Sequence, residues 1–129
     1  AQVIDKEAAR AGRIMDILIE VNVAEEESKF GISCDEAGDL VRECAKLHNI
    51  HVCGLMTIAP FVENCEENRQ YFKKLKQLCV DLKAKNIDNT DMDVLSMGMT
   101  GDYQVAIEEG ATMVRVGTGI FGARNYNVQ

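Results

Sequence analysis

Residues 94–122 read VLSMGMTGDYQVAIEEGATMVRVGTGIFG, an apolar run, a helical segment, a second apolar run and a glycine-rich turn. The two apolar runs are Val94 to Met99 and Met113 to Val116. Their apolar residues follow one another instead of alternating with polar ones, which is typical of strands covered on both faces. The segment between them, Asp102 to Glu109, is predicted to be a short helix with Gly110 as its C′ residue. A strand, a helix and a strand in this order predict parallel pairing through a crossover.

The same alternation extends toward the N-terminus. Two further apolar runs, Ile17 to Val23 and Val52 to Ile58, are separated from the others by segments of helical periodicity. Ser33 and Glu36 form a predicted capping box at the start of the helix between these runs. The helix that follows is predicted to bury a stripe of apolar residues: Phe72, Leu75, Leu78, Cys79 and Leu82. The segment from Ile4 to Ile14 is predicted to be the helix of a preceding unit.

Strands that alternate with helices in this way place the chain in the α/β class. Two architectures fit the pattern, a doubly wound sheet and a (β/α)₈ barrel, and both place ligand sites at the carboxyl ends of the strands. Four strands are half of an eight-stranded barrel. We therefore expect half of a (β/α)₈ TIM-type barrel, with parallel strands and outer helices, in a single domain over residues 1–129.

Composition excludes several classes of function. The chain has 129 residues, a mass of 14.3 kDa and a net charge of -7, which argues against a broad nucleic-acid surface. No apolar run approaches the ~20 residues of a spanning helix, so no membrane partner is expected. Five cysteines without a C-x-x-C pair predict a reduced, cytoplasmic setting. Neither these cysteines nor His48 and His51 have the spacing of a zinc site, so no metal is predicted.

Candidate ligand-binding residues follow the last two strands. The segment SMGMT places the hydroxyls of Ser96 and Thr100 around Gly98, and Gly117 opens the glycine-rich turn after the next strand. Because the ends of neighbouring parallel strands lie at one edge, their amide and hydroxyl donors are predicted to converge on a phosphate. The alternative is a tight turn that requires glycine torsions. A dinucleotide fingerprint is excluded, because it needs an acidic residue about 20 positions downstream and the chain ends before that.

Arg115 lies inside an apolar strand. A guanidinium in such a position is costly unless it is paired. Two explanations remain open from the residues alone: Arg115 contacts a ligand, or it forms a structural ion pair with a glutamate.

Three segments together resemble the pyridoxal phosphate homeostasis protein family, whose members are relatives of the alanine racemase barrel. They are LMTIAPF (55–61), SKFGI (28–32) and LSMGMTGDYQVAIEEGATMVRVGTGIFGAR (95–124), and the resemblance covers essentially the whole chain. It implies a (β/α)₈ barrel that binds pyridoxal 5′-phosphate (PLP), buffers and delivers it, and has no established turnover. No catalytic residue is therefore predicted.

The resemblance also implies roles for individual residues. By motif position, the phosphate-binding residues of the family fall on Ser96, Thr100, Gly117 and Thr118, and the arginine that faces the pyridine nitrogen falls on Arg115. Thr100 stands where a serine is more usual, which keeps the hydroxyl and adds a methyl group.

One feature departs from the family. Its members hold PLP through a Schiff-base lysine in a segment like AVSK, which this chain lacks, so the chain is expected to correspond to the C-terminal half of the family. Lys29 matches the SKxG segment and is expected to order a loop. A half-barrel is expected to form a homodimer or to pair with the missing N-terminal half. The alternative functions are a PLP-dependent amino-acid racemase or lyase and a ligand-free structural half-barrel.

Overall fold

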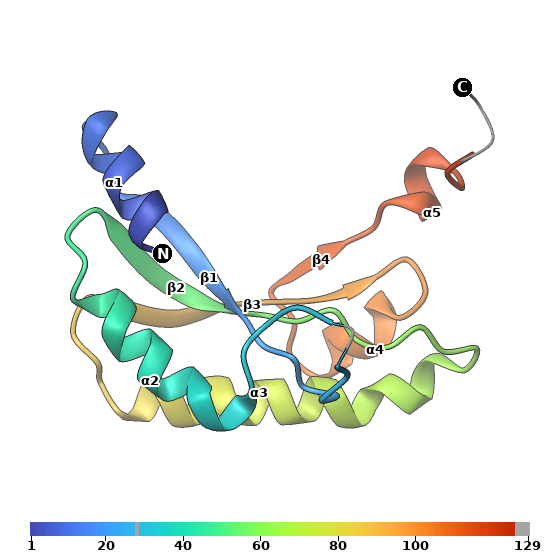
Figure 1. The fold of residues 1–129 in the computed structure, drawn as a ribbon. Helices are drawn as coiled ribbons and strands as arrows, with labels where there is room; N and C mark the ends of the chain where they lie inside the picture. The colour runs from blue at the N-terminus through green and yellow to red at the C-terminus, as the bar shows by residue number, and fades with distance from the viewer. Residues whose placement is uncertain (28, 126–129) are drawn as a thin grey trace.

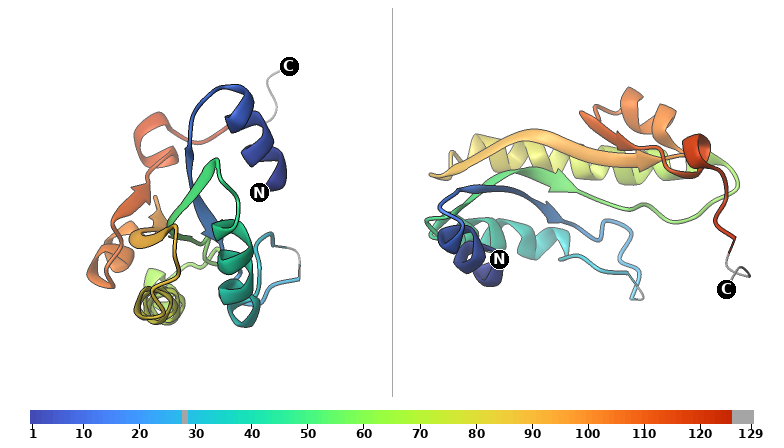
Figure 2. Two further views of the ribbon diagram at one scale, coloured as in Figure 1. Left: turned by 90° about the vertical axis from the view of Figure 1, so that its left-hand side faces the viewer. Right: turned by 90° about the horizontal axis from the view of Figure 1, so that it is seen from above.

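Four parallel strands form one sheet in the order β1-β2-β3-β4 (Figure 1). The structure is a computed structural model and describes residues 1–27 and 29–125. The strands are β1 (Met15–Glu20), β2 (Ile50–Met56), β3 (Thr90–Met99) and β4 (Met113–Arg115). Figure 2 shows the sheet nearly end-on as a trough whose two sides are β1 and β4. The predicted α/β fold with a parallel half-barrel is confirmed.

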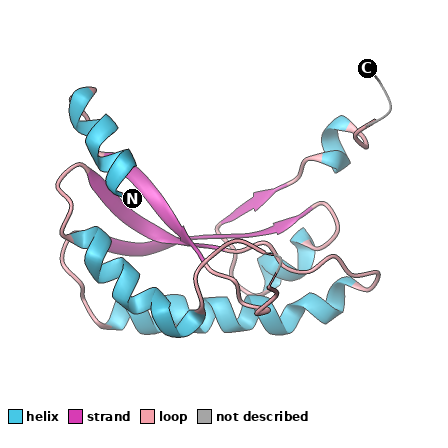
Figure 3. Cartoon of the chain, in the orientation of Figure 1, coloured by secondary structure: helices cyan, strands magenta, loops and turns pink. Residues whose placement is uncertain are grey.

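Helices connect the strands and lie mainly outside the trough. They are α1 (Gln2–Arg10), α2 (Cys34–Ala45), the 3₁₀-helix η1 (Cys65–Asn68), α3 (Arg69–Ala84), α4 (Tyr103–Glu108) and α5 (Thr118–Phe121). Figure 3 shows α2 and α3 together on one face of the sheet. The opposite, concave face of the sheet would form the interior of a complete barrel.

The hydrophobic core fills the space between the sheet and the outer helices. Ile50 and Val52 of β2 pack there, and the intervening His51 belongs to the opposite face because side chains alternate along a strand. The predicted stripe of the third helix is buried in this core, except that Leu78 is only partly buried. Within the described residues, the core therefore lies between the sheet and the helices that cover it.

The strand boundaries differ from the predicted ones. β1 begins at Met15 and β3 at Thr90, earlier than the continuous apolar runs indicated. The added residues include Asp16, Asp91 and Asp93, which are exposed. The prediction required apolar residues on both faces, and it failed here because the concave face of this sheet carries polar side chains.

The predicted helix ends are largely confirmed. Ser33 Oγ accepts a hydrogen bond from the Glu36 N–H at 3.3 Å, as in the predicted capping box, and the Glu36 carboxylate reaches back to accept from the Ser33 hydroxyl at 2.9 Å. Gly110 follows α4 with a φ of +101°, as expected of a C′ residue. The first helix ends at Arg10 rather than at Ile14, because Ala11 already caps it.

Candidate functional site at the ends of the third and fourth strands

The loop after β3 and the turn after β4 lie against each other. Thr100 Oγ1 accepts a hydrogen bond from the Gly119 N–H at 3.0 Å. A Cβ on Gly119 would lie 3.0 Å from Thr100 Cγ2 and 3.1 Å from Val116 Cγ1, so a larger residue would have to displace these side chains slightly. The structure thus brings together the two segments that the sequence singled out.

The predicted residues of the first loop differ in their exposure. Ser96 is only 2% exposed and Gly98 is buried, whereas Thr100 is half-buried. Gly98 has a φ of +99°, and a Cβ there would lie 2.7 Å from the Cβ of Ala106 and 3.0 Å from the Cα of Tyr103. Gly98 therefore allows α4 to pack closely on the end of β3.

Asp102 fixes the shape of the loop after β3. Its Oδ1 accepts a hydrogen bond from the Met99 N–H at 2.8 Å, and its Oδ2 accepts one from Asn68 Nδ2 at 2.8 Å. Asn68 Nδ2 also donates to the carbonyl of Pro60 at 2.9 Å. Neither Asp102 nor Asn68 was predicted from the sequence as part of the site. A signal existed only for Asp102, which stands at the start of a predicted helix, where aspartate is favoured.

Arg115 crosses from β4 to the end of β2. Its Nη2 donates a hydrogen bond to the carbonyl of Thr57 at 2.7 Å. Thr57 in turn donates from Oγ1 to the carbonyl of Val21 at 2.6 Å, and its N–H donates to the carbonyl of Ser96 at 3.0 Å. Thr57, which is fully buried, thereby connects the ends of all four strands. It lies in the LMTIAPF motif, but the sequence gave no indication of this role.

The guanidinium of Arg115 retains an unused donor. Its Nε is buried and has no hydrogen-bond partner within residues 1–27 and 29–125. The pKa of Arg115 is lowered by burial, and this effect is opposed by the charges of Glu20 and Asp102. The proposed ion pair with a glutamate is not what the structure shows, since the strand geometry presents the carbonyl of Thr57 instead. The free Nε–H suits an uncharged or anionic acceptor.

The glycine-rich turn supplies further donors. Gly117 is half-buried and Thr118 is exposed, and α5 begins directly after Gly117. In the part of the chain that the structure describes, the N–H groups of these two residues donate no hydrogen bond. The hydrogen-bond donors at the ends of β3 and β4 are thus these two amides, the hydroxyls of Thr100 and Thr118 and the guanidinium of Arg115.

Lys29 lies in a separate loop after β1. Its Nζ is 4.0 Å from Glu26 Oε2, and both side chains are partly exposed. The same loop is shaped by Asn22, whose side chain donates to the carbonyl of Glu26 at 2.7 Å and accepts from its N–H at 3.2 Å. The first residue of the SKFGI motif, Ser28, lies outside the described residues.

Comparison with known proteins identifies relatives of similar sequence. A protein from Aquifex aeolicus named pyridoxal phosphate homeostasis protein is 46% identical over 126 residues, which are 98% of this chain and 54% of that protein. A protein of the same name from Haemophilus influenzae is 42% identical over 113 residues, 88% of this chain and 47% of that protein. The resemblance inferred from the sequence motifs is thus confirmed. The chain spans about half the length of these curated relatives.

A solved structure shows the same fold. PipY of Synechococcus elongatus PCC7942, solved with PLP bound, has a TM-score of 0.78 and 27% sequence identity over 92% of this chain and 54% of that chain. No helix among the described residues is long and apolar enough to cross a membrane. The family described as "Alanine racemase, N-terminal domain" matches residues 1–125. The chain belongs to this alanine racemase N-terminal domain family.

Proposed function

We propose that this chain binds PLP between the loop after β3 and the turn after β4, and that it serves the storage and delivery of the cofactor. The names of its relatives and the PLP complex of PipY support this function. The observation that carries it is structural: the unused N–H donors of Gly117 and Thr118 lie in the turn that Thr100 joins to the loop. A phosphate is the acceptor that such a turn fits.

Phosphate recognition is assigned to the exposed part of the site. The amides of Gly117 and Thr118, together with the hydroxyls of Thr100 and Thr118, would hold the phosphate oxygens. The buried Ser96 contributes through its backbone, which joins the loop to Thr57. Gly98 contributes by letting the loop pack against α4.

Arg115 would face the pyridine nitrogen with its Nε–H. A guanidinium carries donors only and remains protonated, so it favours the unprotonated form of the pyridine ring. Bound PLP supplies an electron sink, and an unprotonated ring nitrogen weakens that sink. This arrangement suits a carrier of PLP better than an enzyme that uses it, and we assign no catalytic residue.

We further propose that these 129 residues correspond to the C-terminal half of the family and carry the phosphate-binding part of the PLP site. The family motifs place the phosphate-binding residues near its end, and its eight lysines include none in an AVSK-like segment. The edge strands β1 and β4 would then pair with a second copy or with the other half of a barrel. The cysteines of the described chain form no disulfide, which supports a reduced, cytoplasmic setting.

The test compares PLP with pyridoxal, which lacks the phosphate. We expect the purified protein to bind PLP at least about tenfold more tightly, or about 1.4 kcal/mol, because the phosphate contacts are lost in pyridoxal. Thr118→Val should weaken PLP binding by about 1–3 kcal/mol, whereas Thr118→Ser should retain it, because serine keeps the hydroxyl. Absence of PLP binding, or equal affinity for the two compounds, would overturn the proposal.

A further inference from the structure

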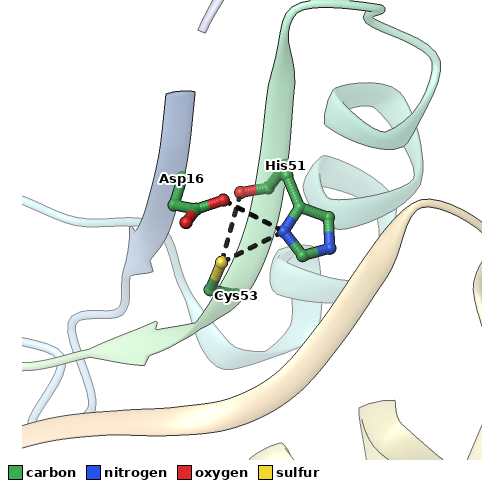
Figure 4. A group of neighbouring side chains, drawn as sticks. All are labelled: Asp16, His51 and Cys53. Carbon is green, nitrogen blue, oxygen red and sulfur yellow. Dashed lines mark hydrogen bonds and ion pairs between the residues drawn. The ribbon is translucent and has the colours of Figure 1, made fainter. Parts of the chain in front are cut away.

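Three side chains with metal-binding atoms meet on the concave face of the sheet, far from the proposed PLP site. Asp16 of β1 pairs in register with His51 of β2, and Cys53 follows two residues later on the same face (Figure 4). His51 Nδ1 lies 3.2 Å from Asp16 Oδ1 and 3.2 Å from Cys53 Sγ. One ligand atom from each residue lies within 4.8 Å of the other two. The three groups therefore converge on one point.

A fourth side chain orients the imidazole. Asp91, at the start of β3, has its Oδ2 3.1 Å from His51 Nε2. When the neutral ring carries its proton on Nε2 and donates a hydrogen bond to this carboxylate, Nδ1 has a free lone pair. Histidines that bind metals commonly have this arrangement, with the second ring nitrogen donating to a carboxylate.

A doubly protonated His51 would donate to both carboxylates, but with a neutral ring hydrogen bonds alone do not satisfy the groups around Nδ1. In the tautomer that Asp91 favours, the Nδ1 lone pair faces a carboxylate oxygen of Asp16, and two acceptors at 3.2 Å repel each other. The thiol of Cys53 has only one proton, and the His51 carbonyl at 3.7 Å also competes for it. A cation placed between the oxygen, nitrogen and sulfur atoms removes this conflict, because all three become its ligands.

Two of the three distances between the ligand atoms, those from His51 Nδ1, are close to the distances around a coordinated ion. Zinc lies about 2.0–2.3 Å from oxygen, nitrogen and sulfur ligands, so tetrahedral ligands are roughly 3.3–3.7 Å apart. The two separations of 3.2 Å in the structure need only small side-chain movements to reach this range. Imidazole and thiolate ligands select zinc-like ions over magnesium or calcium.

We propose that Asp16, His51 and Cys53 form a binding site for a zinc-like divalent metal ion, with Asp91 orienting His51. The ion binds Oδ1, Nδ1 and Sγ, and the thiol proton is released to solvent as the sulfur–metal bond forms. The two anionic ligands balance the charge of the ion, and three protein ligands leave one coordination position open. The site lies at the starts of the strands, whereas the proposed PLP site lies at their ends. Sequence spacing gave no metal prediction because strand pairing alone brings Asp16 to the other two residues.

Cobalt provides the first test, because a cobalt–thiolate bond has a charge-transfer absorption that cobalt in water lacks. We expect the metal-free protein to bind one Co²⁺ per chain with this absorption, and zinc to displace it. His51→Ala and Cys53→Ser should abolish the absorption, and Asp91→Asn should weaken zinc binding by about 10- to 100-fold. The controls His48→Ala and Cys34→Ser should behave like the original protein. A missing absorption, or one that persists in Cys53→Ser, would overturn the proposal.

A second test needs no substitution and does not depend on the folding of a variant. The original protein is alkylated with and without zinc, and each cysteine is quantified by mass spectrometry. Zinc should protect Cys53 and leave the labelling of the partly buried Cys65 unchanged. Equal labelling of Cys53 under both conditions would contradict the site.

Discussion

The hydroxyl of Thr100 accepts a hydrogen bond from the backbone N–H of Gly119 at 3.0 Å, across 19 residues of sequence. This bond joins the loop after β3 to the turn after β4 and so sets the distance between the two halves of the proposed phosphate site. Its partner atoms come from two separate strand ends, which makes the site sensitive to the relative position of β3 and β4.

Removal of this hydroxyl should loosen the site. Thr100→Val leaves the Gly119 N–H without its acceptor and also removes a proposed contact to the phosphate, so we expect PLP affinity to fall by about 1–3 kcal/mol, as for a hydrogen bond to a charged group. Thr100→Ser retains the hydroxyl and should bind as the original protein does. Titration of both variants with PLP measures the difference, and equal affinity for valine and serine would show that the bond does not support the site.

Gly98 should resist substitution more than the nearby Gly101. Gly98→Ala combines a positive φ with a Cβ contact of 2.7 Å to Ala106, so we expect a loss of at least about 1–3 kcal/mol in the free energy of unfolding. A Cβ at Gly101 meets nothing within 4 Å, and Gly101→Ala should be nearly neutral. Urea unfolding of the two variants measures this difference. Equal free energies of unfolding for Gly98→Ala and Gly101→Ala would contradict the close packing of α4 on β3.

Arg69 at the start of α3 should contribute stability that depends on pH. Its guanidinium is within 2.8 Å of Glu66 and 2.7 Å of both Glu108 and Glu109. Arg69 lowers the pKa of Glu66 from its ordinary value of 4.5. A carboxyl with a lowered pKa stabilises the folded state above its ordinary pKa, and this contribution is lost as the pH falls through the lowered value.

Arg69→Leu should therefore reduce the melting temperature at neutral pH, and the difference from the original protein should shrink below about pH 4.5. Lys46→Leu serves as a control, since Lys46 forms a single exposed pair with Glu43. A difference for Arg69→Leu that stays constant down to strongly acidic pH would show that the side chain acts through packing instead.

Borohydride reduction should not fix PLP to one lysine of this chain. Lys29 lies beside Glu26, and the other lysines belong to helices or to residues that cap them. We expect mass analysis after reduction to show scattered labelling well below one PLP per chain. Stoichiometric labelling of a single lysine would contradict the prediction that none of these eight lysines forms an imine with PLP, and labelling of Lys29 would also refute its assigned role in the loop.

The open edges of the sheet should cause two copies of the chain to associate. β1 and β4 each have one neighbour in the sheet, and Met15 and Met113 on these strands are 40% and 49% exposed. We expect sedimentation to show a homodimer, whose contacts Met113→Lys should weaken by placing a charge on the edge. A stable monomer of 14.3 kDa with a cooperative melt would show that the sheet tolerates its edges unaided.

Much of the fold was predictable because it depends on local signals. The capping box of Ser33 and Glu36, the C′ position of Gly110 and the helical stripe around Phe72 each involve residues within a few turns of one another. Their order along the chain then predicted the parallel half-barrel, since crossover connections allow few topologies. The strand boundaries were less accurate, because Asp16 and Asp91 interrupt the apolar pattern on the concave face.

Local patterns along the chain were enough to predict the α/β class, the order of the elements and the two segments that carry the proposed phosphate site. They did not predict which side chains meet, because that depends on the folded sheet. Arg115 contacts Thr57 across 58 residues, and Asp16 contacts His51 across 35. The physical reason is that such contacts depend on the register and curvature of the sheet. Register and curvature both depend on how all the core side chains pack together, so they cannot be predicted from the spacing of residues along the chain.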